Sequence, residues 1–210
     1  MIQLHFSPSS VAMAPHFLLR ELDLPHQLIR VDTAAGAHRQ PAYLKLNPNG
    51  LIPTLVDGDF VLYETAAILL HLSDSAGRLL PALGTRERAL AYQWLVWLTN
   101  TLQPALIIYF YPERWDAERP EAIKAQAEAK VLAMLQQLDE QLARHGQPWL
   151  LGSEFTAVDC MAFTLCRWTR NFAGKKARDF AHIGPYLQRL LERPALQKVF
   201  EVEGLQAPFC

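Results

Sequence analysis

The N-terminal third of the chain alternates short extended runs with amphipathic stretches. Period-two alternation over Ile2–Phe6 predicts a strand, and the apolar spacing from Val11 to Leu22 predicts a helix. A second strand is expected over His26–Val31. Strand, helix and strand in this order predict a parallel pair joined by a right-handed crossover.

The loop and hairpin that follow contain an unusual proline. The turn formers of Asn47–Gly50 precede a short apolar run that includes Pro53. Because proline cannot donate to a strand ladder, Pro53 must lie at the first residue of a strand, on an edge or in a cis bend. Ile52 then offers its backbone to a partner outside the sheet. Asp57-Gly58 predicts a two-residue hairpin turn.

A helix is expected from Glu64 to Ser75. Its first turn carries the carboxylate of Glu64 and the hydroxyl of Thr65 beside free backbone N–H groups, at the positive end of the helix dipole. Such a group can bind a ligand that carries both an amine and a carboxylate. With a short helix near Pro41, the element order is βαβαββα, which predicts a thioredoxin-like α/β domain over residues 1–76 and a linker over residues 77–84.

From residue 85 to residue 210 only helical periodicity remains, which predicts an all-α helical bundle. Thr156-x-x-Asp159 forms a capping box at the start of a helix that reaches Trp168 and is apolar nearly all round. Pro104 predicts a kink in the first long helix. The other helices are expected over Arg86–Tyr109, Pro120–His145, Ile183–Arg193 and Pro194–Val202.

Composition narrows the possible partners. The 210 residues are 50% hydrophobic and 20% charged, with a net charge of −1 and no basic run, which disfavours nucleic acid and anionic membranes. No segment approaches the about 18 apolar residues of a membrane span, and a cytoplasmic location is expected. The seven histidines are scattered and predict no metal site. The cysteines are expected to be reduced and structural: Cys160, Cys166 and Cys210.

The ordered motifs NP-x-G-x-x-P, hairpin and E-[ST]-x-A-I resemble the glutathione site of the glutathione S-transferase family. The resemblance implies that Ile52, before a cis-Pro53, pairs its backbone with the cysteinyl part of glutathione. It also implies that Glu64 and Thr65 hold the γ-glutamyl end. The Thr156 capping box is similar to the folding element of the C-terminal domain in this family, so the resemblance covers essentially the whole chain.

In this family the thiol of glutathione lies near the end of the first strand. The unperturbed pKa of a thiol is about 8.5, and a hydroxyl donor with a helix dipole lowers it by stabilising the thiolate. Aligned with the tyrosine and cysteine classes, Phe6 and Val11 occupy the active positions and cannot serve. The serine of theta-like and zeta-like classes falls on Ser9, with Ser10 next to it. Either serine is a candidate, and both can also be simple helix caps.

Two further groups follow from the resemblance. His38 and Arg39 match an H-[KR]-x-P segment that binds the glycine carboxylate in phi-like and theta-like transferases, although a solvated loop is an alternative. A pocket for the acceptor is expected between the domains, on the helix that begins at Arg86. Its candidate residues, which could equally belong to the core or a dimer interface, are Gln103, Phe110 and Tyr111.

The resemblance implies a homodimeric, serine-type glutathione S-transferase of bacterial type, with theta-, phi- and beta-like features. It would act in detoxification, with glutathione as co-substrate and a small hydrophobic electrophile as acceptor. A glutathione-dependent isomerase or dehalogenase is one alternative, and a non-catalytic glutathione-, ligand- or partner-binding protein is another. A thiol–disulfide reductase is least favoured, because the first domain contains no cysteine.

Overall fold

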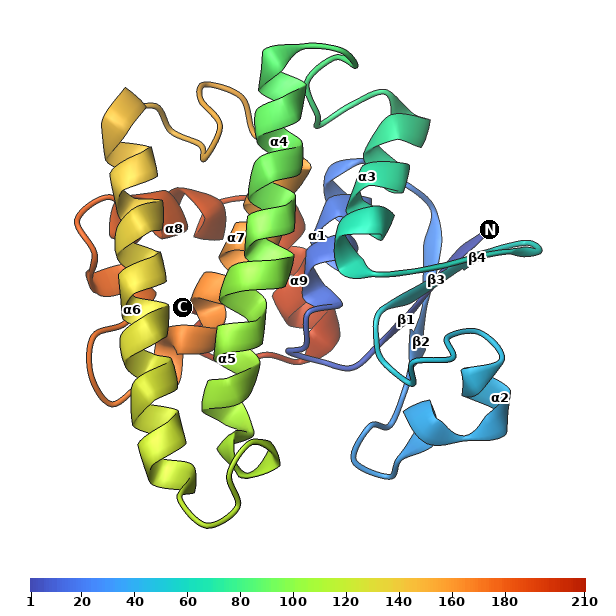
Figure 1. Ribbon diagram of the computed structural model, residues 1–210. Helices are drawn as coiled ribbons and strands as arrows, with labels where there is room; N and C mark the ends of the chain where they lie inside the picture. Colours follow the sequence, from blue (N-terminus) through green and yellow to red (C-terminus); the bar gives the residue numbers. More distant parts are fainter. The chain divides into compact units, whose positions relative to one another are not determined.

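The computed structural model describes all 210 residues, which form two compact units (Figure 1). Unit 1 comprises Met1–Leu80 and Glu192–Gln206, and unit 2 comprises Pro81–Leu191 and Ala207–Cys210. None of the helices combines the length and apolar character that crossing a bilayer requires.

Unit 1 is built on a four-stranded sheet with the strand order β2-β1-β3-β4. The strands are β1 (Ile2–Phe6), β2 (His26–Arg30), β3 (Thr54–Asp57) and β4 (Phe60–Tyr63). β1 and β2 are parallel, as the predicted crossover requires, and β3 runs antiparallel to both β1 and β4. Leu4 and Leu55 are paired and fully buried, so the centre of the sheet belongs to the core. The thioredoxin-like arrangement is confirmed.

The helices of unit 1 are α1 (Met13–Glu21), the single-turn α2 (Pro41–Leu44), α3 (Thr65–Ala76) and α9 (Pro194–Glu203). α1 packs against both α3 and α9. It begins two residues later than predicted, because the chain from Ser10 forms successive turns, with the amide of Met13 donating to the carbonyl of Ser10 at 3.1 Å.

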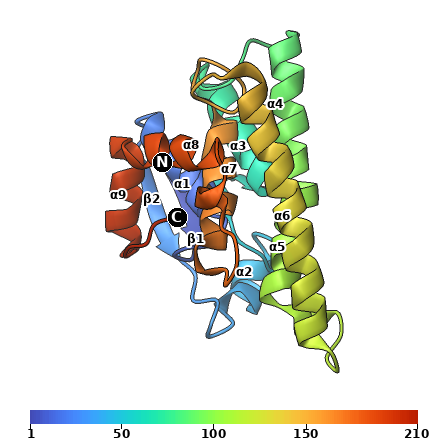
Figure 2. The same ribbon diagram turned by 90° about the vertical axis from the view of Figure 1, so that its left-hand side faces the viewer.

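The sequence predicts one helical domain over residues 85–210, but in the structure helix α9 belongs to unit 1. In Figure 2 it lies beside α1. Its apolar face is buried, and at its first turn the guanidinium of Arg193 binds the carboxylate of Glu21 in bidentate fashion, at 2.6 and 2.7 Å. A grouping based on chain order cannot anticipate this return to the first unit.

Unit 2 contains α4 (Arg86–Trp97), α5 (Gln103–Phe110), α6 (Pro120–His145), α7 (Ala157–Trp168) and α8 (Ile183–Leu191). The break predicted near Pro104 is present, but it takes the form of a π-helical segment, Leu98–Leu102, between α4 and α5. Proline cannot donate to the preceding turn, and a wider turn accommodates the lost hydrogen bond. The capping box of Thr156 and Asp159 is confirmed, and α7 is buried along almost its whole length.

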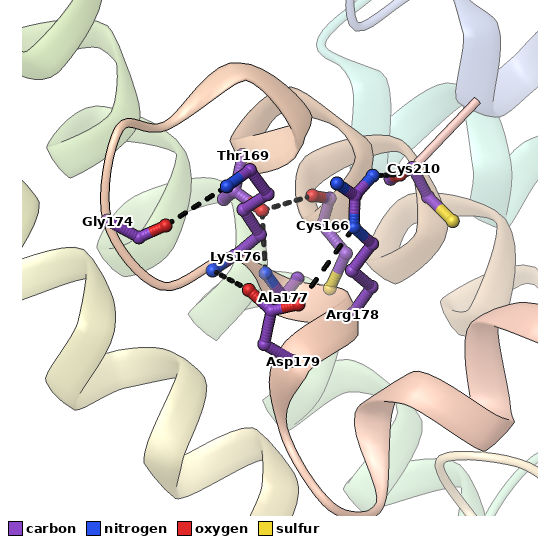
Figure 3. A network of polar contacts seen from close by, with 8 residues as sticks. All are labelled: Cys166, Thr169, Gly174, Lys176, Ala177, Arg178, Asp179 and Cys210. Carbon is purple, nitrogen blue, oxygen red and sulfur yellow. Dashed lines mark hydrogen bonds and ion pairs between the residues drawn. The ribbon is translucent and has the colours of Figure 1, made fainter. Parts of the chain in front are cut away.

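The segment after α7 is held by a small polar network (Figure 3). The hydroxyl of Thr169 donates to the carbonyl of Cys166 at 2.8 Å and accepts from the amide of Ala177 at 2.9 Å. The guanidinium of Arg178 donates to the carbonyl of Cys210. This contact fixes the last residues of the chain to unit 2. Every cysteine is a free, buried thiol.

Candidate active site

Three segments that contain predicted site residues meet at one edge of the sheet of unit 1. In the sheet register His5 pairs with Thr54, and Thr54 pairs with Tyr63. The loop from Ser7 to Ser10, which we call the serine loop, therefore begins just after this row on β1. Ile52-Pro53 lies just before the row on β3, and Glu64 follows it directly on β4. The sequence motifs, which are up to 55 residues apart in the chain when Ser9 and Glu64 are compared, converge because of strand pairing.

In the serine loop, the hydroxyl of Ser10 has two backbone partners. It donates to the carbonyl of Ser7 at 2.6 Å and accepts from the amide of Ala12 at 3.2 Å. A serine hydroxyl carries a single proton, so the donor capacity of Ser10 is used within the loop. Ser10 therefore stabilises the turn that leads into α1.

Ser9 has a left-handed backbone, with φ +62°. Its amide donates to Oε2 of Glu203 at 2.9 Å, across 194 residues of chain. The other carboxylate oxygen, Oε1, lies 2.9 Å from Nδ1 of His16, and both of these side chains are fully buried. A carboxylate on α9 thus fixes the backbone of the serine loop.

Sequence reasoning missed both Glu203 and His16. A signal was present in α9, where Leu196, Val199 and Phe200 form the buried face and Glu203 lies one turn further along it, at i+7 from Leu196. An acidic residue on an apolar helix face requires a buried polar partner.

The Ile52–Pro53 peptide bond is cis, one of the arrangements predicted for Pro53. β3 begins at Thr54, so Ile52 lies outside the strand ladder. The preceding carbonyl, that of Leu51, accepts from the hydroxyl of Tyr43 at 2.7 Å and from Nδ2 of Asn47 at 2.8 Å. Neither Tyr43 nor Asn47 was among the predicted site residues, although Asn47 belongs to the turn cluster that drew attention to the loop.

Glu64 is exposed and occupies the N-cap position of α3, with φ +73° and ψ +118°. Its side chain makes no capping hydrogen bond, while Thr65, the first helical residue, is buried. Besides glycine, four residues of the chain have positive φ, and two of them are the predicted site residues Ser9 and Glu64. Such conformations are costly for side-chain-bearing residues and concentrate at ligand-binding sites.

His38 and Arg39 lie in a single 3₁₀ turn, Ala37–Arg39. Arg39 is exposed, and Nδ1 of His38 is buried without a hydrogen-bond partner. Gly50 packs against this turn: a Cβ there would lie 3.2 Å from the carbonyl oxygen of His38, and its φ of +60° also favours glycine. The 3₁₀ turn and the loop before Pro53 are therefore adjacent.

The predicted acceptor residues lie in unit 2. Gln103 begins α5, and Phe110 and Tyr111 stand at its end with about two fifths of their surfaces exposed. The ring of Phe110 meets that of Trp168 edge-on at 6.0 Å, and the guanidinium of Arg114 lies 4.0 Å from the ring centre of Tyr111. These rings form an accessible aromatic group.

No three His, Cys, Asp or Glu side chains gather as a metal site would require. Unit 1 contains no cysteine. The serine loop, the backbone of Ile52 and the carboxylate of Glu64 remain as the chemical groups at the sheet edge.

Comparison with known proteins gives consistent matches along the chain. Residues 8–75 match the glutathione S-transferase N-terminal domain, and residues 100–194 match the C-terminal domain. Glutathione S-transferase GstA of Escherichia coli O157:H7 is 30% identical over 98% of this chain and 100% of its own. The disulfide-bond oxidoreductase YfcG of Escherichia coli K12 is 30% identical over 81% of each chain.

Among solved structures, a glutathione transferase homologue from Sulfitobacter with bound glutathione superposes with a TM-score of 0.86 and 26% identity. The match covers 98% of this chain and 99% of the homologue. Both domain models, a full-length relative and a full-length structural match agree, and the chain belongs to the glutathione S-transferase family.

Proposed function

We propose that this protein is a glutathione S-transferase that activates the thiol of glutathione for attack on a small apolar electrophile. The observation that carries the proposal is the convergence of the serine loop, Ile52-Pro53 and Glu64 at one edge of the sheet. Each of these segments supplies a different chemical group, and a γ-glutamyl tripeptide has a complement for each of them.

Glutathione would lie along this edge in an extended form. The backbone N–H and C=O of Ile52 would pair with the cysteinyl residue, and Glu64 and Thr65 would bind the amine and carboxylate of the γ-glutamyl end. Glu64 suits this role because its exposed carboxylate is not used to cap α3. His38 and Arg39, next to the loop before Pro53, would bind the glycine carboxylate.

Ser9 is the preferred donor to the thiolate. The single proton of the Ser10 hydroxyl is given to the carbonyl of Ser7, so Ser10 would have to break the turn to reach a ligand. A hydrogen bond from the Ser9 hydroxyl would stabilise the charged sulfur and lower the pKa of the bound thiol. Serine here donates a hydrogen bond to the thiolate, keeps its own proton and forms no covalent bond.

In unit 2, the exposed rings of Phe110 and Tyr111, with the amide of Gln103 on the same helix, would bind the acceptor. An apolar, aromatic surface suits an apolar electrophile. Detoxification of such compounds would be the physiological role.

We further propose a homodimer in the cytoplasm. Exposed apolar side chains on both units support an interface with a second copy, among them Phe60 on β4 and Leu90 and Val96 on α4. Three free thiols and no disulfide are typical of a reducing compartment.

The test compares Ser9→Ala with Ser10→Ala by following the ultraviolet absorbance of bound thiolate as pH is varied. We expect Ser9→Ala to raise the pKa of bound glutathione by about one unit, equivalent to about 1.4 kcal/mol, with a parallel loss of conjugation rate. Ser10→Ala should affect protein stability more than the thiol. A large shift in Ser10→Ala with none in Ser9→Ala would reassign the role, and a wild-type protein that does not bind glutathione would overturn the proposal.

A second candidate activity is reduction of small disulfides, favoured by the similarity to a disulfide-bond oxidoreductase. Because unit 1 has no cysteine, two molecules of glutathione would have to supply both thiols. One mixed disulfide would form and be resolved, giving two reduced product thiols and one glutathione disulfide. Turnover of a model disulfide such as hydroxyethyl disulfide, without conjugation of any electrophile, would favour this activity.

A further inference from the structure

The hydroxyl of Tyr43 joins the two sides of the Ile52-Pro53 segment. It donates to the carbonyl of Leu51 at 2.7 Å and lies 2.9 Å from Oγ1 of Thr54. Since a phenol has one proton and a carbonyl cannot donate, the Thr54 hydroxyl must donate to the Tyr43 oxygen. The result is a relay from Thr54 through Tyr43 to Leu51, which brackets the two residues between them.

This relay is buried. Thr54 is fully buried, and only 6% of Tyr43 is exposed. Burial raises the pKa of the Tyr43 phenol above its ordinary value, and the hydrogen bond with Thr54 opposes that rise only in part, so the group stays protonated and able to donate at neutral pH. A buried phenol oxygen is costly unless its bonds are made, so a residue needed only for packing would be served as well by phenylalanine.

The relay also attaches the loop to the sheet. Thr54 occupies the central place of the row in which His5, Thr54 and Tyr63 are paired, and the ring of Tyr43 meets that of His5 edge-on at 5.8 Å. Asn47 also donates to the carbonyl of Leu51, but it makes no bond to β3. The hydrogen bonds of Tyr43 connect Leu51 to Thr54, the first residue of β3.

We infer that Tyr43 is a positioning residue for glutathione: its hydroxyl fixes the main chain on both sides of Ile52, in the orientation that pairs with the cysteinyl backbone of the ligand. Tyr43 itself makes no contact with the ligand in this proposal. The inference rests on the proposed function, because it assigns Tyr43 to the glutathione site described above.

The first test is Tyr43→Phe, with glutathione affinity measured by titration calorimetry. Because this variant loses one neutral hydrogen bond of the relay, we expect the dissociation constant for glutathione to rise about fivefold. In steady-state assays the KM for glutathione should rise by a similar factor while kcat stays within about twofold, since the thiol-stabilising serine is untouched. Tyr92→Phe, the same change at a partly exposed tyrosine on α4, is the matched control and should alter neither value.

A ligand analogue separates positioning from a general loss of structure. In a depsipeptide analogue of glutathione, an ester oxygen replaces the cysteinyl N–H and removes its bond to the carbonyl of Ile52. Wild-type protein should bind this analogue about tenfold more weakly than glutathione, as expected for a lost hydrogen bond that leaves a carbonyl unpaired. In Tyr43→Phe the penalty should be clearly smaller, because the Ile52 backbone is no longer held against the ligand.

Thr54→Val provides a second variant if Tyr43→Phe does not fold. It removes the hydrogen bond between Thr54 and Tyr43 and keeps the phenol. The affinity lost when the analogue replaces glutathione should therefore be reduced as in Tyr43→Phe, whereas Thr54→Ser should show the wild-type loss. If wild type, Tyr43→Phe and Thr54→Val all lose the same affinity when the analogue replaces glutathione, the inference is overturned, while the proposed function stays intact. Failure of wild-type protein to bind glutathione would overturn both.

Discussion

Replacement of Glu203 tests whether the last helix of the chain holds the serine loop. Both oxygens of this buried carboxylate are used, one by the amide of Ser9 and the other by the ring of His16, each at 2.9 Å. Glu203→Ala removes the carboxylate partner of the buried His16 ring and of the part-buried Ser9 N–H. Removing one member of a buried pair costs about 3–5 kcal/mol. We expect unit 1 to be destabilised by about 4 kcal/mol.

The conservative variant separates hydrogen bonding from charge. In Glu203→Gln the amide oxygen can still accept from Ser9, and the amide nitrogen can face an unprotonated Nδ1 of His16. We therefore expect this variant to lose only about 1–2 kcal/mol, close to the value of one charge-assisted hydrogen bond compared with a neutral one.

Hydrogen–deuterium exchange is the most direct assay, because it resolves the two units. Peptides from β1, α1 and α9 should lose protection in Glu203→Ala. All five tryptophans of the chain lie in unit 2, so tryptophan fluorescence during urea unfolding reports on that unit and supplies an internal reference.

Glu201→Ala is the matched control for Glu203. Glu201 lies on the same helix but pairs at 2.8 Å with Lys198 on the exposed surface, where an ion pair contributes about 0–1 kcal/mol. If Glu203→Ala destabilises unit 1 no more than Glu201→Ala does, the carboxylate is not what holds the loop.

Two further predictions concern the ligand and the pH. Glu64→Ala should weaken glutathione binding about tenfold, because a charge-assisted hydrogen bond is lost. Calorimetry measures the dissociation constant, and Glu64→Gln should give an intermediate value. An unchanged dissociation constant in Glu64→Ala would contradict the proposed orientation of glutathione. Burial lowers the pKa of both His5 and His26 in unit 1; at His26 the hydrogen bond with the carbonyl of Leu24 opposes this effect and the charge of Arg20 adds to it. Groups with a depressed pKa favour the folded state above their unfolded value of about 6.5 and oppose it as pH falls below that value. Thermal unfolding followed by circular dichroism should therefore show stability falling from pH 7 to pH 5, with a shallower fall in His5→Asn; an identical slope would contradict the assignment.

Local chemistry made most of unit 1 predictable. The hairpin over Asp57-Gly58 and the helix start at Glu64 depend on turn residues and on backbone rules that act within a few positions. The same rules left three arrangements open for Pro53, of which the structure has the cis bond. The helix over Pro120–His145 has the predicted bounds for a similar reason, with proline in its first turn and glycine after its last.

Contacts between distant segments were not predictable in this way. Ser9 and Ser10 are equivalent as turn-forming residues in the sequence, and the structure distinguishes them: the Ser10 hydroxyl donates to the carbonyl of Ser7, whereas Ser9 has a positive φ and its amide donates to Glu203. The return of α9 to unit 1 left one trace in the sequence, an acid on an apolar face, which becomes informative only when its partner is known. The relay through Tyr43 left no such trace in the sequence, because a buried tyrosine in a short helix looks like any other core residue.

The two strained residues of the site explain why such distant partners are needed. A positive φ at Ser9 or Glu64 costs about 1–3 kcal/mol, so each conformation persists only where the surroundings impose it. Glu203 imposes it on the serine loop through the Ser9 amide, while on the other side strand pairing fixes Tyr63, the residue before Glu64. The N-terminal family domain over residues 8–75 does not include Glu203, so it contains the proposed glutathione-binding groups without the contact that holds one of them. The proposed binding unit therefore includes α9 as well as the N-terminal residues.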